Sequence, residues 1–243
     1  MRMLNFAKRN FKELIRDPLS LILEIGLPLF LLFIFQQFNI PGEVYKIENF
    51  TPGIILFGFS FISLFTATLI AKDRSSSFLI RLGTSPMKSS DFILGYIISL
   101  IPIILIQDIL FFTLACLLGL TPTVNIIYTI LISIVISIFF IGLGILIGSL
   151  LSEKGTGGLG SVIVQLVCFT SGMYFTPEMV GKGFAVICDI LPFSSCLNII
   201  KGMLNNQLEI ISLQNILIVL IYTICILTLA IIVFKKKMVS DNK

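Results

Sequence analysis

Three polar side chains interrupt long apolar runs in this 243-residue chain, and they are the first candidates for chemistry. Glu24 follows the start of the first run by about two helical turns, and Gln107 and Asp108 lie deep in a later one. An ionisable group inside such a run is costly unless it faces a protein interior or water, so Asp108 is a candidate for a polar pathway. A hydrogen bond between helices would explain Asp108 equally well, and Glu24 could extend back to an interface.

The residue types that usually carry catalysis or bind metals are absent or scattered. The chain has no histidine, which removes the commonest general base and metal ligand. Three cysteines lie within apolar runs, whereas Cys188 and Cys196 share one segment and are either a disulfide or two unpaired thiols. We therefore predict no catalytic residue, no metal site and no cofactor in this chain, and no binding of nucleic acid.

Two glycine patterns resemble known motifs. Residues 155–160 match the spacing GxGxxG, but no β-strand precedes them, so a nucleotide site is rejected in favour of a flexible entry into a helix. Gly144 and Gly148 form a GxxxG pair, which lets two helix backbones approach closely. Packing within the chain is the favoured use of this pair.

The elements that carry these residues are membrane-spanning helices. The chain is 56% hydrophobic and 12% charged, with a mean hydropathy of +1.06, whereas soluble domains are about 25% charged. Its apolar runs have the length that crosses the hydrocarbon core of a bilayer. We predict an all-α membrane protein, forming a single domain over residues 1–243, with six transmembrane helices at 19–38, 51–71, 92–118, 125–151, 157–176 and 213–234.

The distribution of basic residues predicts the orientation of these helices. With the N-terminus in the cytoplasm, fourteen lysines and arginines fall on the inner side. Lys46, Lys182 and Lys201 alone fall on the outer side. This positive-inside bias places both termini of a multi-pass protein in the cytoplasm.

Residues 1–17 have the pattern of an amphipathic helix at the inner membrane surface. Phe11, Leu14 and Ile15 belong to its apolar face and Arg16 to its basic face. No small-residue cleavage site follows the first apolar run, so we do not expect a cleaved signal peptide. A basic leader that only enforces orientation is the alternative.

Two segments between the helices are too apolar to be simple solvated loops. The loop 72–91 carries Phe78, Leu79, Arg81 and Leu82 between charged and serine-rich flanks, and it needs either the bilayer surface or, as we favour, a groove on a cytoplasmic protein. The outer segment 177–212 contains apolar runs too short to span a membrane. We predict a re-entrant helical hairpin there and an outer gate, with a compact cap outside the membrane as the alternative.

The order of these features resembles the type-2 ABC transporter permeases of the bacterial drug- and peptide-export kind. Residues 9–18, which lead into a span containing Pro28, resemble the family's entry helix. Arg74, Arg81–Leu82 and Ser85–Pro86 resemble its coupling segment. Residues 172–175 before Pro177, with 191–192 and 198–201, resemble its fifth span and re-entrant outer helices.

The resemblance implies a permease subunit of an ATP-driven exporter in the bacterial cell membrane. Two permeases, identical or sister subunits, would pair in the bilayer and sit on two cytoplasmic ABC ATPases that hold ATP and Mg²⁺. This chain would then not be an enzyme. Three groups of residues are assigned on this basis: ATPase coupling to Arg74, Phe78, Leu79, Arg81, Leu82 and Pro86; the pathway to Glu24, Gln107 and Asp108; and the outer gate to Pro192, Phe193 and Asn198.

A stand-alone membrane protein is the competing interpretation. It would be an ion-coupled transporter or an immunity-type protein, it would use Asp108 as a proton site, and it would need no ATPase. The absence of an inverted repeat weighs against many secondary transporters, since the long loop after the second predicted span is basic and the one after the fifth is apolar.

Overall fold

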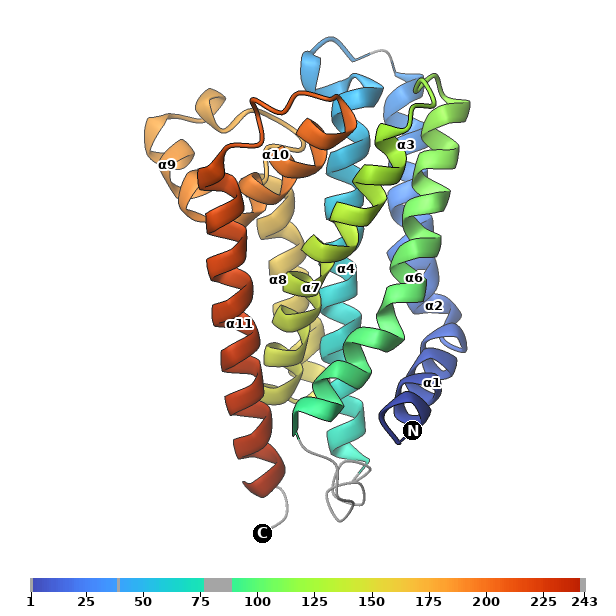
Figure 1. The fold of residues 1–243 in the computed structure, drawn as a ribbon, viewed down its shortest axis with the longest axis vertical. Coiled ribbons are helices and arrows are strands. Elements are labelled where there is room, and N and C mark those ends of the chain that lie inside the picture. Colours follow the sequence, from blue (N-terminus) through green and yellow to red (C-terminus); the bar gives the residue numbers. More distant parts are fainter. Residues whose placement is uncertain (1, 39, 77–88, 241–243) are drawn as a thin grey trace.

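The structure is a computed structural model that describes residues 2–38, 40–76 and 89–240. Within these residues it is all-α, with no strand. Figure 1 shows a bundle of long helices, with α1 across one end and α9 and α10 at the other. The elements are α1 (Arg2–Ile15), α2 (Pro18–Leu21), the π-helix η1 (Ile22–Gly26), α3 (Leu27–Gln37), the 3-10 helix η2 (Glu43–Tyr45), α4 (Ile47–Ser75), α6 (Ser89–Leu117), α7 (Asn125–Leu150), α8 (Glu153–Thr170), the 3-10 helix η3 (Pro177–Met179), α9 (Lys182–Ile190), α10 (Pro192–Leu204) and α11 (Leu213–Ser240).

Five helical segments in the described part of the chain are long and apolar enough to cross a membrane. They are Pro18–Gln37, Ile47–Ser75, Ser90–Leu117, Asn125–Leu150 and Leu213–Lys237, and the bent pair α9–α10 would be a sixth if counted as one span. Five of the six predicted spans therefore match a candidate span. The remaining predicted span, 157–176, does not pass the same test.

That region forms α8, which begins and ends earlier than predicted. The Ser152 side chain accepts a hydrogen bond from the Gly155 backbone N–H at 3.4 Å and so caps the start of the helix. The helix ends at Thr170, because Gly172 adopts a φ of +86° that turns the chain out of the helix. The early start brings Glu153 and Lys154 into the helix and lowers its average apolarity.

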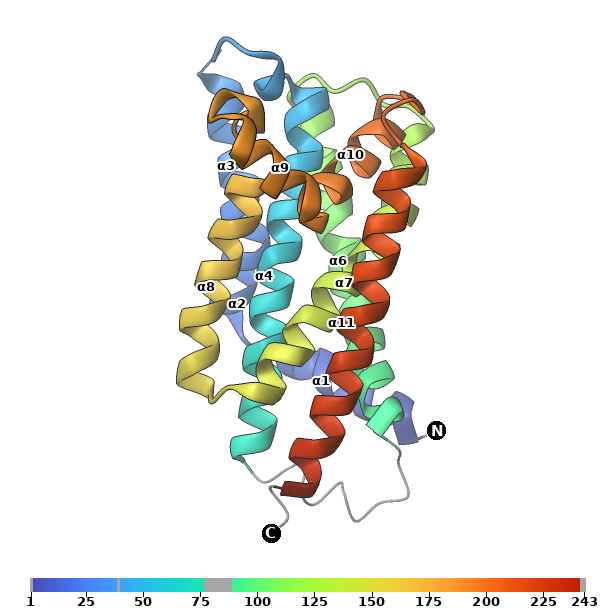
Figure 2. The ribbon, with the colours of Figure 1, turned by 90° about the vertical axis from the view of Figure 1, so that its left-hand side faces the viewer.

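Helix α4 is the centre of the bundle. It is buried along most of its length and packs against α3, α6, α7, α8 and α10. Figure 2 shows it enclosed between α8 on one side and α7 on the other. A helix surrounded in this way contacts little lipid, so protein neighbours contact its apolar side chains on all faces.

The GxxxG pair makes the contact between α4 and α7, as the sequence predicted. A Cβ atom placed on Gly144 would lie 2.4 Å from the Ser63 backbone oxygen, and one on Gly148 would lie 2.5 Å from that of Ala67. No side chain fits at those distances, so glycine at both positions allows the two backbones to touch.

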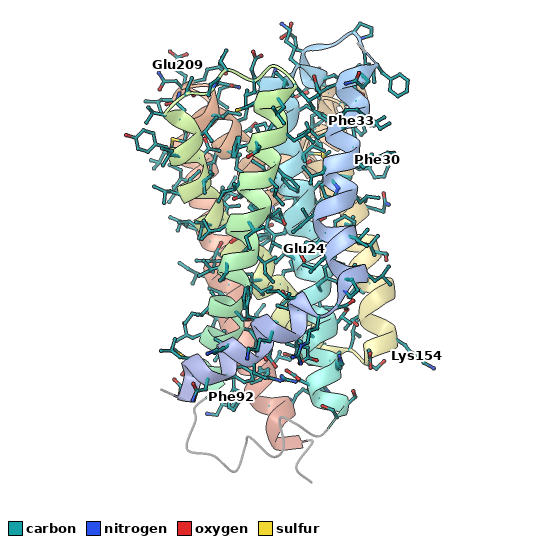
Figure 3. All side chains as sticks on the ribbon, turned by 90° about the vertical axis from the view of Figure 1, so that its right-hand side faces the viewer. Glu24, Phe30, Phe33, Phe92, Lys154 and Glu209 are labelled. Carbon is teal, nitrogen blue, oxygen red and sulfur yellow. The ribbon has the colours of Figure 1, made fainter. Side chains whose placement is uncertain are left out.

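The first span is interrupted by a π-helical turn at Ile22–Gly26. Pro28 lacks an N–H group, and its ring would clash with the carbonyl of Glu24 in a regular α-helix, so the wider turn accommodates it. Figure 3 shows Glu24 on the inner side of this span, whereas Phe30 and Phe33 point away from the bundle. Glu24 is 2% exposed, so it is buried and does not extend to an interface as considered above.

The outer segment contains two helices, α9 and α10, that meet at an angle of 79°, which is the geometry either of a broken span or of the predicted re-entrant hairpin. Pro192 occupies the first turn of α10 and forces the break, because its ring cannot continue the preceding helix. Helix α10 packs against α4, α7 and α11 and is largely buried. Cys188 and Cys196 are buried free thiols, so of the two alternatives the unpaired one holds.

Candidate functional site

A buried ion pair joins α1 to α4 at the end of the bundle where α11 ends. Arg9 Nη1 lies 2.7 Å from Asp73 Oδ1 and donates to Asp73 Oδ2 at 2.9 Å. The Tyr96 hydroxyl of α6 donates to the same Oδ2 at 2.8 Å. Asp73 is 1% exposed and Tyr96 fully buried, so the carboxylate depends on these two donors for the stabilisation that water would otherwise give.

A second, half-buried ion pair lies beside the first. Arg9 Nη2 also lies 2.6 Å from Glu13 Oε2, one helical turn further along α1. Glu13 Oε1 in turn lies 3.0 Å from Lys72 Nζ, which neighbours Asp73 on α4. Two oppositely charged pairs therefore connect the same two helices, and each carboxylate is matched by a cation.

Aromatic packing adds α6 to this connection. The Phe6 ring meets Phe92 and Tyr96 edge-on, with centroid distances of 5.5 and 5.0 Å. Gly95 leaves the space for it, since a Cβ atom there would lie 2.5 Å from the Phe6 ring. Helix α1 is thus fixed by contacts to both α4 and α6.

These two helices are the ones that flank the predicted coupling loop. Helix α4 ends at Ser75 and α6 begins at Ser89. Five predicted coupling residues lie between them and outside the described residues, namely Phe78, Leu79, Arg81, Leu82 and Pro86. The structure therefore brings α1 to the two ends of the loop.

Arg74 is the one predicted coupling residue that the structure describes, and it has a role within the chain. Its Nη1 donates to the backbone oxygens of Gly148, Ser149 and Leu151 at 3.0, 2.8 and 3.2 Å. These oxygens belong to the C-terminal end of α7, where helical carbonyls lack partners and a cation is favourable. Arg74 therefore ties α7 to α4 close to the loop.

The four residues assigned to the interfacial helix do not share one environment. Leu14 is buried against the bundle, and Phe11 is half-buried. Ile15 is 49% exposed and Arg16 is exposed. The helix therefore has one face against protein and another that no other described part of the chain covers.

The three pathway candidates are buried but have separate neighbours. Asp108 accepts a short hydrogen bond from the Ser133 hydroxyl of α7. Gln107 faces α4, where a Cβ atom on Gly58 would lie 2.4 Å from its amide nitrogen. The pairing of Asp108 with Ser133 fits the helix-to-helix hydrogen bond considered above.

The residues assigned to the outer gate all lie on α10, with Pro192 and Phe193 at its start and Asn198 in its middle. Pro192 is buried, and Asn198 is half-buried. The Phe193 ring lies 6.1 Å from both Phe139 and Phe140 of α7. These contacts fix the start of α10 against the middle of the bundle.

Sequence reasoning missed the central members of this site, Asp73 and Tyr96. In the sequence, Arg9 lies in the amphipathic segment 1–17 and Tyr96 near the start of the predicted span 92–118, and neither position indicates a partner. One signal was available, since Asp73 is an acidic residue between Lys72 and Arg74 at the end of an apolar run. An acid in that position suggests a charge partner, although its identity is not determined by spacing.

Comparison with known proteins identifies the family. A family model described as ABC-2 type transporter matches residues 3–208, which include α1, the flanks of the coupling loop and the outer helices. No curated protein matches the chain. Permease domains of this family do not themselves hydrolyse ATP. The chain therefore belongs to the ABC-2 type transporters and is a multi-span membrane subunit of that family.

Proposed function

We propose that this chain is the permease of an ATP-driven exporter in a bacterial cell membrane. It pairs with a second copy or a sister permease, and the pair sits on two separate ABC ATPases. ATP and Mg²⁺ are held by those ATPases, and the permeases form the translocation pathway.

The observation that carries this proposal is the three-helix connection through Asp73. Helix α1 is held to α4 and α6 by the Arg9–Asp73 pair and the Tyr96 hydrogen bond. A partner that pushes on the segment between α4 and α6 therefore moves α1 with it. A loop that only linked two spans would not need a buried ion pair beside it, since such a pair has a large desolvation cost.

Six crossings, with α8 as the sixth, support the predicted orientation. Figure 2 shows α8 running beside α4 from the end where α7 finishes to the end that holds α9. Its 18 residues rise about 27 Å at 1.5 Å per residue, which is close to the hydrocarbon thickness of about 30 Å. With an even number of crossings, helix α1 and the C-terminal end of α11 lie on the same side of the membrane. The basic residues gather on that side, which is therefore the cytoplasmic one.

The exposed face of α8 supports pairing with another permease. Gly157, Gly158, Ser161 and Gln165 are exposed and lie along one stripe of the helix. A glutamine amide facing lipid would lack hydrogen-bond partners, which costs several kcal/mol in hydrocarbon. This stripe faces the second permease or the water-filled pathway between the two subunits, with small residues allowing close approach.

In this mechanism, ATP binding closes the two ATPases and displaces the coupling loop. The connected ends of α1, α4 and α6 move as one body, and the long α4 carries the movement across the bilayer. At the outer end, α10 packs on α4 and, through Phe193, on α7, so that movement of those helices shifts the gate.

Copurification with an ABC ATPase, from cells that express the chain together with its genomic neighbours, tests the proposal. The full chain is captured in mild detergent, and Phe78 and Leu82 are changed to alanine together. We expect stoichiometric ATPase with the unchanged chain and its loss with the double variant. Changing Val186 and Ile187 to alanine is the matched control, since both are more than half exposed at the opposite end. Absence of the ATPase from cells that make it, or full retention by the Phe78/Leu82 variant, contradicts the proposal.

A further inference from the structure

Helix α1 has three faces, two of which the other described residues leave uncovered. Phe6, Ala7, Asn10 and Leu14 are buried against the bundle. Leu4 and Ile15 are 56% and 49% exposed and share a second face at helical spacing. The third face carries exposed basic side chains at four-residue intervals, Lys8, Lys12 and Arg16.

The basic face forms one wall of an open groove of about 630 Å³. Asn5, Arg9, Glu13 and Asp17 of α1 and its connection, with Lys72 of α4, complete the lining. Five basic residues line this groove against two acidic ones. The groove therefore attracts anions.

The two acids in the groove are already engaged. Glu13 is paired with Arg9 and Lys72, and Asp17 accepts from the Ser20 hydroxyl and backbone. Among the described residues, no acidic partner approaches Lys8, Lys12 or Arg16 within ion-pair distance. Like charges four residues apart destabilise a helix, so a counter-charge from beyond the described residues would stabilise this row.

The neighbouring apolar face indicates where that counter-charge comes from. At 100° per residue, Leu4 and Ile15 lie beside Lys8 and Lys12 around the helix. An amphipathic helix with this arrangement places its apolar side chains among lipid tails and its cations at the level of the headgroups. Exposed leucine and isoleucine beside a cationic row fit a bilayer better than a soluble acidic protein.

We propose that the groove beside Lys8, Lys12 and Arg16 binds the phosphate headgroup of an anionic phospholipid in the leaflet next to α1. Because Arg9 and Lys72 of the same groove hold Asp73 and Glu13, the bound lipid adjoins the connection between α1 and α4. The inference rests on the membrane placement of α1 in the proposed function, but not on the ATPase partnership.

Lipid binding to the purified full chain tests this proposal. The protein in nonionic detergent is titrated with dioctanoyl phosphatidylglycerol or dioctanoyl phosphatidylcholine, and bound lipids are counted by native mass spectrometry. We expect the anionic lipid to bind more tightly. Because each basic residue near an anionic surface contributes about 1 kcal/mol, or roughly fivefold, changing Lys8, Lys12 and Arg16 to glutamine together should weaken that binding by up to roughly 100-fold.

The matched control removes three charges elsewhere. Lys235, Lys236 and Lys237 lie near the end of α11, and their change to glutamine should leave the lipid preference intact. If the α1 triple variant does not fold, as judged by circular dichroism, Lys12→Gln alone should weaken binding by about fivefold.

Four results would overturn the proposal. Unchanged phosphatidylglycerol affinity in the folded α1 variant would remove the site. An equal loss in the α11 variant would reduce the effect to net charge. Displacement of the lipid by millimolar inorganic phosphate would assign the groove to a free anion. If the α1 triple variant lost ATPase capture but kept the lipid preference, the groove would be assigned to a protein partner. Failure of ATPase copurification by the unchanged chain, in contrast, affects only the proposed function.

Discussion

The Arg9–Asp73 pair permits a quantitative test of how α1 is held to the bundle. Breaking a buried ion pair by removing one partner costs about 3–5 kcal/mol when the other charge stays buried. Arg9 is 35% exposed and the Tyr96 hydroxyl still donates to Asp73, so Arg9→Gln should destabilise the fold by about 2–3 kcal/mol. Asp73→Asn should cost less, about 1–2 kcal/mol, because Arg9 keeps Glu13 and water.

The double variant measures the interaction itself. Replacing both charges by amides leaves no unpaired buried charge, so the combined loss should be smaller than the sum of the two single losses by about 1.5–2 kcal/mol. The assay is reversible unfolding in mixed micelles with increasing SDS, followed by circular dichroism, on the unchanged chain and the three variants.

The exposed pair Glu43–Lys46 provides the control cycle. Its atoms are 2.8 Å apart, as close as those of the buried pair, but the side chains are 77% and 57% exposed. The hydrogen bond from Lys46 to Glu43 and the Glu43 charge raise the pKa of Lys46, yet water screens such pairs and their coupling is small. A coupling at Arg9–Asp73 no larger than that at Glu43–Lys46 would refute the reasoning that burial makes the α1 connection strong.

Three further predictions follow from packing and chemistry at other positions. Gly148→Ala should lower stability by about 1–3 kcal/mol, because its Cβ atom would meet a backbone oxygen of α4 at 2.5 Å, whereas Gly183→Ala in α9, with open space around it, should be neutral or stabilising in the same unfolding assay. Asp108→Asn should fold normally, because the amide oxygen still accepts the hydroxyl hydrogen bond from α7; unchanged export by this variant would rule out a transport role for the carboxylate. Cys188 and Cys196 should both be alkylated after unfolding without reductant, and a mass two hydrogens lower with neither of them modified would contradict the free thiols.

Hydropathy and charge predicted much of the fold, because each span is determined locally. The runs around α4, α6, α7 and α11 gave boundaries within a few residues of the structure except at α11, which extends to Ser240. The contact made by Gly148 was also predictable, since a glycine pair at this spacing has few other uses in a membrane helix. The amphipathic pattern likewise identified α1.

Features that depend on contacts between distant residues were not predictable. Asp73 is 64 residues from Arg9 and 23 from Tyr96, and no spacing rule connects them. The end of α8 depends on the positive φ of Gly172, whereas an apolar run alone extends past it. The π-helical turn that buries Glu24 arises from Pro28, one turn later in the chain. The direction that this turn gives to the Glu24 side chain could not be predicted from the sequence.

The short connection between α7 and α8 has a consequence for how the protein is made. Only Leu151 and Ser152 separate the two helices, and α8 alone is not apolar enough to qualify as a span. A segment of this polarity partitions poorly from the translocon into lipid when it is presented by itself. In the six-crossing topology proposed above, helix α8 enters the bilayer as the second half of a hairpin with the strongly apolar α7.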